Sequence, residues 1–129
     1  MRLADFKHRS RIILALDHLG KLKDSHILKR VVAKVAGVKI GLPLVLSGEY
    51  SRIISVLREL SVYILADFKL ADIPDIMIKT VEKVIDVVDG VIAHAFVGQE
   101  AISKLSRFLM KRGIELFLVI AMTHKGAEE

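Results

Sequence analysis

The stretch at residues 62–74 reads VYILADFKLADIP. Its first half is apolar on both faces, which is typical of a strand inside a parallel sheet covered by helices. Asp67, Lys69 and Asp72 follow at the end of the apolar run, and Pro74 then opens a segment with helical periodicity. The stretch therefore predicts a buried strand, a charged loop and a helix, in that order.

The same alternation continues in both directions along the chain. Strands are predicted from apolar runs at 12–17, 36–41, 62–69, 89–95 and 114–121. Amphipathic segments with the period of a helix lie between them at 22–34, 43–60, 74–87 and 99–112. The strands recur about every 26 residues, which is the length of one strand-helix unit in a parallel sheet.

Two architectures contain such repeats, the open doubly wound sheet and the (β/α) barrel. The glycine-rich phosphate loop of a dinucleotide-binding fold is absent after the first strand, since residues 14–22 read LALDHLGKL. We therefore predict an α/β fold of the (β/α)8 TIM-barrel type. Eight units would need roughly 210 residues. The 129 residues thus correspond to a single domain, the N-terminal portion of a barrel, with five parallel strands and four intervening helices.

Composition excludes several classes of protein. The chain has no Cys, which excludes disulfides and thiolate metal sites and fits a cytoplasmic location. No apolar run reaches the roughly 18 residues that a membrane-spanning helix needs. The net charge is +5, but the basic residues are spread along helical faces without interleaved aromatic residues. We therefore expect neither a membrane nor a nucleic acid as a partner.

Four charged residues fall where predicted strands end. Asp17 ends the first strand, Lys39 lies near the end of the second, and Asp67 and Lys69 end the third. In a parallel barrel, functional residues gather at this edge of the sheet. Asp67 and Lys69 are two positions apart, so the period of a strand points both side chains to one face. The sequence predicts that Lys39, Asp67 and Lys69 converge.

Structural roles are the alternative for each of these residues. Asp17 could start a loop, and Asp72 could cap the helix that begins at Pro74. A buried ion network is a poor device for stability alone, because removing each charge from water costs several kcal/mol before pairing. We therefore favour a functional site. His94 and His124 also end strands, and a packing or loop role is favoured for both because no metal-ligand spacing accompanies them.

At 67–74 the sequence matches the pattern D-x-K-x-x-D-I-P, and the chain resembles the N-terminal part of an archaeal-type orotidine 5′-monophosphate decarboxylase. ILALD at 13–17, VKIG at 38–41 and AMTHKGAE at 121–128 add to the resemblance. The D-x-K-x-x-D pattern is shared with 3-keto-L-gulonate 6-phosphate decarboxylase and hexulose-phosphate synthase. Those relatives use Mg²⁺ and typically carry a glutamate where this chain has Lys39.

The resemblance implies a carboxy-lyase of pyrimidine (UMP) biosynthesis that acts without a cofactor or metal. Lys69 would give a proton to C6 of the pyrimidine, and Asp67 would lie beside the substrate carboxylate. Asp17 and Lys39 would hydrogen-bond the ribose hydroxyls. In a homodimer, Asp72 would reach into the neighbouring subunit's site.

Three further positions complete the site that the resemblance implies. Ile73 would line the pyrimidine pocket, and Thr123 stands where relatives usually have a serine that contacts the base. Ile76 is a departure, because the family commonly has a threonine there that helps to hold the ribose.

In this family the substrate phosphate is gripped mainly by loops after strands six to eight, which this chain does not supply. We therefore expect the chain to be a fragment or the product of a shortened gene, which alone has little or no decarboxylase activity and a tendency to oligomerise. The alternatives are a Mg²⁺-dependent relative that acts on a sugar phosphate and a non-catalytic half-barrel module.

Overall fold

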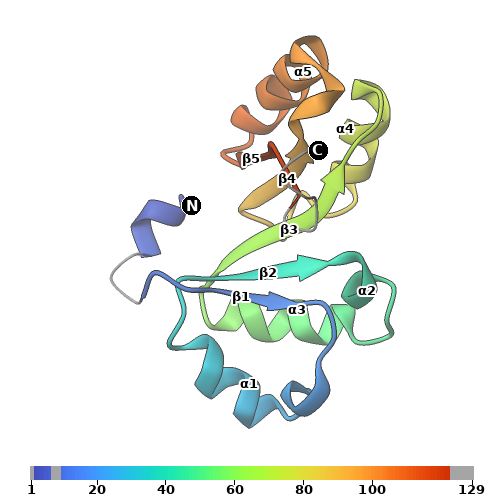
Figure 1. Cartoon of the computed structure of the whole chain (residues 1–129). Coiled ribbons are helices and arrows are strands. Elements are labelled where there is room, and N and C mark those ends of the chain that lie inside the picture. The colour runs from blue at the N-terminus through green and yellow to red at the C-terminus, as the bar shows by residue number, and fades with distance from the viewer. Residues whose placement is uncertain (1, 7–9, 123–129) are drawn as a thin grey trace.

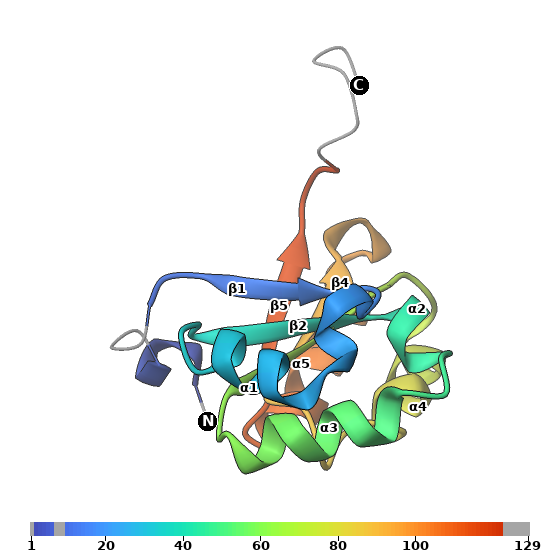
Figure 2. The same cartoon turned by 90° about the horizontal axis from the view of Figure 1, so that it is seen from below.

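The computed structural model describes residues 2–6 and 10–122. Five parallel strands form one sheet in the order of the chain, β1-β2-β3-β4-β5. Their bounds are Ile13–Leu16, Gly37–Gly41, Tyr63–Leu70, Gly90–His94 and Glu115–Val119. The strand direction turns steadily from β1 to β5 (Figure 2), as the handed twist of parallel strands requires. The prediction of five parallel strands is confirmed.

Helices connect successive strands and lie on one face of the sheet (Figure 1). They are α1 (Ser25–Val32), α2 (Leu42–Val45), α3 (Tyr50–Glu59), α4 (Pro74–Glu82) and α5 (Gln99–Met110). Short 3₁₀ turns occur at η1 (Leu3–Phe6), η2 (Gly20–Lys23) and η3 (Ala95–Val97). With the strands, they form an incomplete (β/α) barrel.

The helices predicted at 22–34 and 74–87 are longer than those observed, Ser25–Val32 and Pro74–Glu82. The helix predicted at 43–60 is divided into α2 and α3. Between α2 and α3, the Ser47 hydroxyl donates to the Leu44 carbonyl at 2.7 Å and accepts from the Glu49 amide at 3.3 Å. These side-chain hydrogen bonds take the place of backbone hydrogen bonds of a continuous helix. Gly48, which has no side chain, adopts the turn conformation easily. The second connection therefore contains two helices, which corrects the prediction of four intervening helices.

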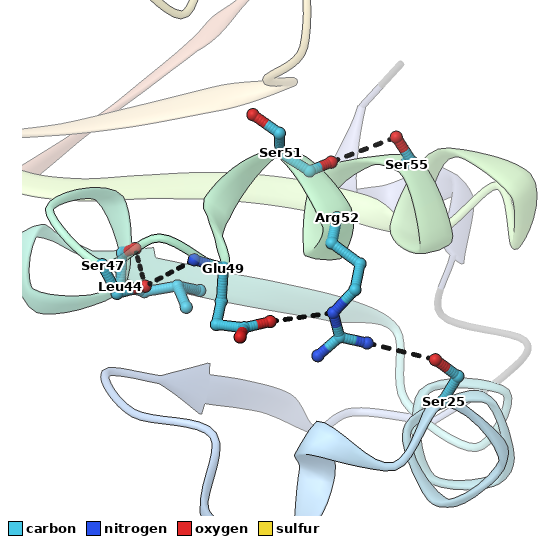
Figure 3. Close-up of polar contacts among 7 residues, drawn as sticks. All are labelled: Ser25, Leu44, Ser47, Glu49, Ser51, Arg52 and Ser55. Carbon is cyan, nitrogen blue, oxygen red and sulfur yellow. Dashed lines mark hydrogen bonds and ion pairs between the residues drawn. The ribbon is translucent and has the colours of Figure 1, made fainter.

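An arginine fixes α3 against α1 (Figure 3). The Arg52 guanidinium donates from Nε to Glu49 at 2.8 Å and from a terminal nitrogen to the Ser25 hydroxyl at 3.1 Å. Ser25 is the first residue of α1, and the preceding Asp24 caps that helix by accepting the His26 amide at 2.8 Å. The contact joins the starts of two helices that are distant in sequence.

The main apolar core lies between the sheet and the helices. Alternate strand residues point into it, and residues at helical spacing meet them, which explains why both periods are visible in the sequence. The strands contribute Leu16, Val38, Ile40, Ile64, Ala66, Val91 and Ala93, and the helices contribute Leu28, Val32, Ile53, Leu57, Met77, Val81, Leu105 and Leu109. All fifteen are buried.

A second, smaller cluster occupies the opposite face of the sheet near the starts of the strands. Tyr63 is fully buried there, and its ring meets Phe6 edge to face with centroids 5.9 Å apart. The Tyr63 hydroxyl donates to Glu115 at 2.9 Å, and the Leu3 amide donates to the same carboxylate oxygen at 2.6 Å. Burial, together with the hydrogen bond and the negative charges of Glu115 and Asp89, raises the pKa of Tyr63. The η1 segment thus closes the end of the sheet where the strands begin.

The outer strands β1 and β5 each pair with one neighbour. Large apolar side chains beside them are exposed, among them Ile12, Leu118 and Ile120. In the part of the chain that the structure describes, no helix has the length and apolar character to cross a membrane.

Candidate functional site

The strand register brings the predicted site residues to one edge of the sheet. Lys39 of β2 lies level with Leu65 of β3, and Gly41 lies level with Asp67. Because parallel strands end at the same edge, Asp67 and Lys39 meet at the C-terminal edge, on the face away from the main core. Asp17 directly follows β1 at this edge.

Lys39, Asp67 and Lys69 form one connected ion cluster. The Asp67 carboxylate accepts from Lys69 Nζ at 2.9 Å and 2.8 Å through its two oxygens. Lys39 Nζ lies 3.0 Å from Asp67 Oδ2. The side chain of Asp67 is 5% exposed, whereas those of Lys39 and Lys69 are 31% and 38% exposed. The predicted convergence of the three side chains is confirmed, and both lysine side chains are partly exposed.

Two opposing effects act on the Asp67 carboxyl. Burial by itself raises its pKa, because the charged form loses water. Hydrogen bonds from Lys69 and Lys39 and the two positive charges outweigh burial, and the pKa of Asp67 lies below its ordinary value. Asp67 is therefore a carboxylate at neutral pH and holds both lysines in place.

A β-bulge places Lys69. The pairing of β3 with β4 is regular at Ala66 opposite Val91, shifts after it, and resumes at Leu70 opposite Ala93. Lys69 has φ +42°, in the left-handed region. Side chains other than glycine pay about 1 kcal/mol or more for this conformation. The period of a strand predicts the correct partners, and the Lys69 ammonium contacts Asp67 from a strained bulge.

Asp17 follows β1 and lies beside the end of β2. Its side chain is exposed, and one carboxylate oxygen lies in the space where a side chain on Gly41 would begin. A Cβ added to Gly41 would stand 2.3 Å from Asp17 Oδ1. The end of β1 therefore leans over the end of β2, toward the strand that carries Lys39.

Asp72 does not join the ion cluster. It is exposed, and its carboxylate accepts the Ile73 amide at 2.7 Å. The residue preceding α4 is Ile73, which provides no side-chain cap, so the structure gives no support to a capping role for Asp72. Asp72 and Ile73 line a cavity of ≈ 530 Å³ together with the first turns of α5.

The remaining candidates are placed as follows. Ile76 in α4 is 42% exposed near Ile73, which is 63% exposed. His94 ends β4 and its ring lies 4.7 Å from that of Phe96, in keeping with a packing role. Thr123 and His124 fall outside the described residues. Within the described ranges, no group of three or more His, Cys, Asp or Glu residues could hold a metal ion.

Sequence reasoning missed two features of this edge. The sequence does not indicate that the Asp17 carboxylate lies where a side chain at position 41 would begin, because Gly41 reads as part of an ordinary strand end. Phe96 is 76% exposed in the η3 turn that follows β4, and its exposure cannot be read from the sequence.

Comparison with known proteins places this geometry in a family. A family model described as "Orotidine 5'-phosphate decarboxylase / HUMPS family" matches residues 10–129. Curated orotidine 5′-phosphate decarboxylases include that of Methanosphaera stadtmanae, 35% identical over 94% of this chain and 56% of its own length. The Sulfurisphaera tokodaii relative is 41% identical over 89% of this chain and 53% of its own length. The chain thus spans about half the length of the curated relatives it matches.

Solved structures agree with the sequence relatives. The orotidine 5′-monophosphate decarboxylase of Sulfolobus solfataricus superposes with a TM-score of 0.80 at 38% identity, over 91% of this chain and 55% of that one. The Methanocaldococcus jannaschii enzyme, complexed with the inhibitor BMP, superposes with a TM-score of 0.78 at 33% identity. That match covers 92% of this chain and 55% of the other.

Proposed function

Because the chain belongs to the orotidine 5′-phosphate decarboxylase / HUMPS family, we propose that it supplies the charged catalytic residues of an orotidine 5′-monophosphate decarboxylase. The reaction releases CO₂ from orotidine 5′-monophosphate and leaves UMP. The observation that carries the proposal is the Lys39–Asp67–Lys69 cluster at the C-terminal edge of the sheet. Lys39 favours this reaction over those of the Mg²⁺-dependent relatives, because those relatives typically carry a glutamate at this position.

The chemistry explains why a lysine beside a buried carboxylate is useful. When the bond from C6 to the carboxylate breaks, its electron pair stays on C6, where no neighbouring carbonyl delocalises it. The Lys69 ammonium stabilises this developing charge and then transfers a proton from Nζ to C6, and water later reprotonates the amine. The electrostatic effect is large because the ammonium is held in place before the reaction begins.

Asp67 has two effects in this scheme. It fixes Lys69 through two hydrogen bonds of 2.9 Å and 2.8 Å. It would also face the substrate carboxylate, and at about 4 Å the repulsion would be roughly 4 kcal/mol at an effective dielectric constant near 20. That repulsion is relieved as CO₂ leaves. We treat it as secondary to the stabilisation that Lys69 provides.

Substrate binding is assigned to the residues around the cluster. Asp17 and Lys39 hold the ribose hydroxyls, and Thr123 contacts the base. Asp72 reaches across a homodimer interface into the neighbouring site, and Ile73 lines the pyrimidine pocket. The exposure of Asp72, Ile73 and Ile76 on one loop and helix start supports such an interface. This scheme requires no cofactor. We expect the reaction to take place in the cytoplasm.

The remaining requirement is a grip on the phosphate. Remote binding energy from the phosphate can be used to lower the barrier at C6. Loops after strands six to eight provide it in this family, and among the described residues β1 and β5 each pair with a single strand. We therefore expect full turnover from a closed barrel and little from the 129 residues alone.

The proposal is tested by titrating the chain with 6-hydroxyuridine 5′-monophosphate, which mimics the carbanionic intermediate, and by assaying conversion of orotidine 5′-monophosphate to UMP. Saturable binding that is lost in Lys69→Ala is expected. Turnover that requires Mg²⁺ and is abolished by EDTA would instead identify the sugar-phosphate class. Absence of binding at every reachable concentration, in the chain and in a barrel completed with the second half of the Sulfolobus relative, would favour a passive module.

A further inference from the structure

Asp17, Gly41 and Asp67 occupy one row at the C-terminal edge of the sheet. Gly41 is the register partner of Asp67, and the last residue of β1, Leu16, pairs with the residue before Gly41. Asp17 therefore follows β1 directly opposite Gly41. The middle position of this row carries no side chain.

The glycine is required there by space and not by backbone conformation. Gly41 has φ −100° and ψ 170°, which any residue adopts. A Cβ built on it would stand 2.3 Å from Asp17 Oδ1 and 3.5 Å from Pro43 Cδ. The first distance is far below van der Waals contact, so an alanine could be accommodated only if the Asp17 carboxylate moved. The second is an ordinary contact that needs no adjustment.

The atom displaced is the end of a short and exposed side chain. Rotation of Asp17 about its own torsions would remove the overlap without moving the backbone. The cost to folding is therefore small, whereas the cost to the position of the carboxylate is large. Gly41 thus differs from Gly37 at the start of the same strand, where an added Cβ would stand 3.1 Å from the Tyr63 backbone carbonyl.

We propose that Gly41 is a positioning residue that leaves room for the Asp17 carboxylate to lie over the end of β2, where it can accept a hydrogen bond from a ribose hydroxyl. The proposal rests on the proposed function for the identity of that ligand. The placement of Asp17 itself is independent of it. Alanine at position 41 would turn the carboxylate away from the row that holds Asp67.

A double-mutant cycle with Gly41→Ala, Asp17→Ala and the double variant tests the proposal. Binding of 6-hydroxyuridine 5′-monophosphate and of its 2′-deoxy and 3′-deoxy forms is measured by calorimetry. Loss of a hydrogen bond to a charged group costs roughly tenfold or more in affinity. Each single variant should lose preference for the hydroxylated nucleotide by that factor, and the double variant should lose no more. Gly48→Ala is the matched control, because nothing lies within 4 Å of a Cβ there.

A second measurement does not depend on nucleotide binding. The side-chain ¹³C carboxyl signal and the χ1 couplings of Asp17 are compared by NMR in the chain, Gly41→Ala and Gly48→Ala. A changed Asp17 rotamer in Gly41→Ala alone, with a melting temperature within a few degrees of the parent, is expected. An unchanged rotamer, or additive losses of affinity in the cycle, would overturn the proposal. A changed rotamer with unchanged affinity would instead refute the ribose role of Asp17, and so the proposed function at that residue.

Discussion

Lys69 has the left-handed backbone φ of +42°, within a strand that otherwise pairs regularly with β2. Two substitutions, Lys69→Gly and Lys69→Ala, measure what this backbone conformation costs in stability. Both remove the ammonium and its bonds to Asp67, so the difference between the two variants reports the backbone alone.

The expected difference follows from two opposing quantities. A residue with a Cβ pays about 1–2 kcal/mol in the left-handed region, and glycine does not. Glycine in turn loses about 0.5–1 kcal/mol more conformational entropy on folding than alanine. The glycine variant should therefore be more stable by roughly 0.5–1 kcal/mol. At a regular strand position only the entropy difference remains, and alanine should be more stable by about the same amount.

The free energy of unfolding is measured by urea denaturation followed by far-UV circular dichroism, with linear extrapolation to water. Ala15→Gly is the control, since Ala15 is an exposed residue of β1 and is not among the positions with positive φ. That variant should lose about 0.5–1 kcal/mol. If Lys69→Ala is more stable than Lys69→Gly by a similar margin, residue 69 has an ordinary strand conformation and the bulge does not aim its side chain.

Three further predictions concern other parts of the molecule. Ser61 follows α3 with φ +49°, so Ser61→Gly should raise the free energy of unfolding by about 0.5–1 kcal/mol in the same assay, and a decrease would contradict the assignment. Tyr63→Phe removes the hydrogen-bond donor to Glu115 and should lower the free energy of unfolding by about 1–2 kcal/mol. An unchanged melting temperature would show that the pair adds no stability. Because the pKa of Asp67 lies below its unfolded value, its contribution is present above about pH 4 and is lost as the pH falls through the folded value. The stability difference between the chain and Asp67→Asn should therefore shrink in acid, and a difference independent of pH would refute the role of the carboxylate.

The order of strands and helices was predictable because each element has a strong local signal. The strands from 36–41 to 89–95 are apolar on both faces, and the segments between them have one apolar face. Helix ends were less predictable, since they depend on hydrogen bonds such as those of Ser47 with Leu44 and Glu49. These bonds are short-range, but the same residues are compatible with a continuous helix.

The cluster of Lys39, Asp67 and Lys69 was predictable because strand period and parallel register together fix which side chains share a face. The bulge that turns Lys69 was not, because it arises from pairing with β4 and leaves no mark in the local sequence. The contact of Tyr63 with Glu115 joins residues 52 positions apart. Such contacts follow from the folded register and not from the composition of either segment.

The polar groups at the two ends of the sheet are paired differently. Where the strands begin, Glu115 receives hydrogen bonds from Tyr63 and the Leu3 amide, and Phe6 covers the ring. Where they end, two lysines share one carboxylate, so these three side chains together carry a net charge of +1, and Lys69 also has a strained backbone. A second lysine adds repulsion that stability alone does not require. In the function proposed above, the negative charge that develops at C6 would stand at Lys69, where the positive charge and the strained backbone lie.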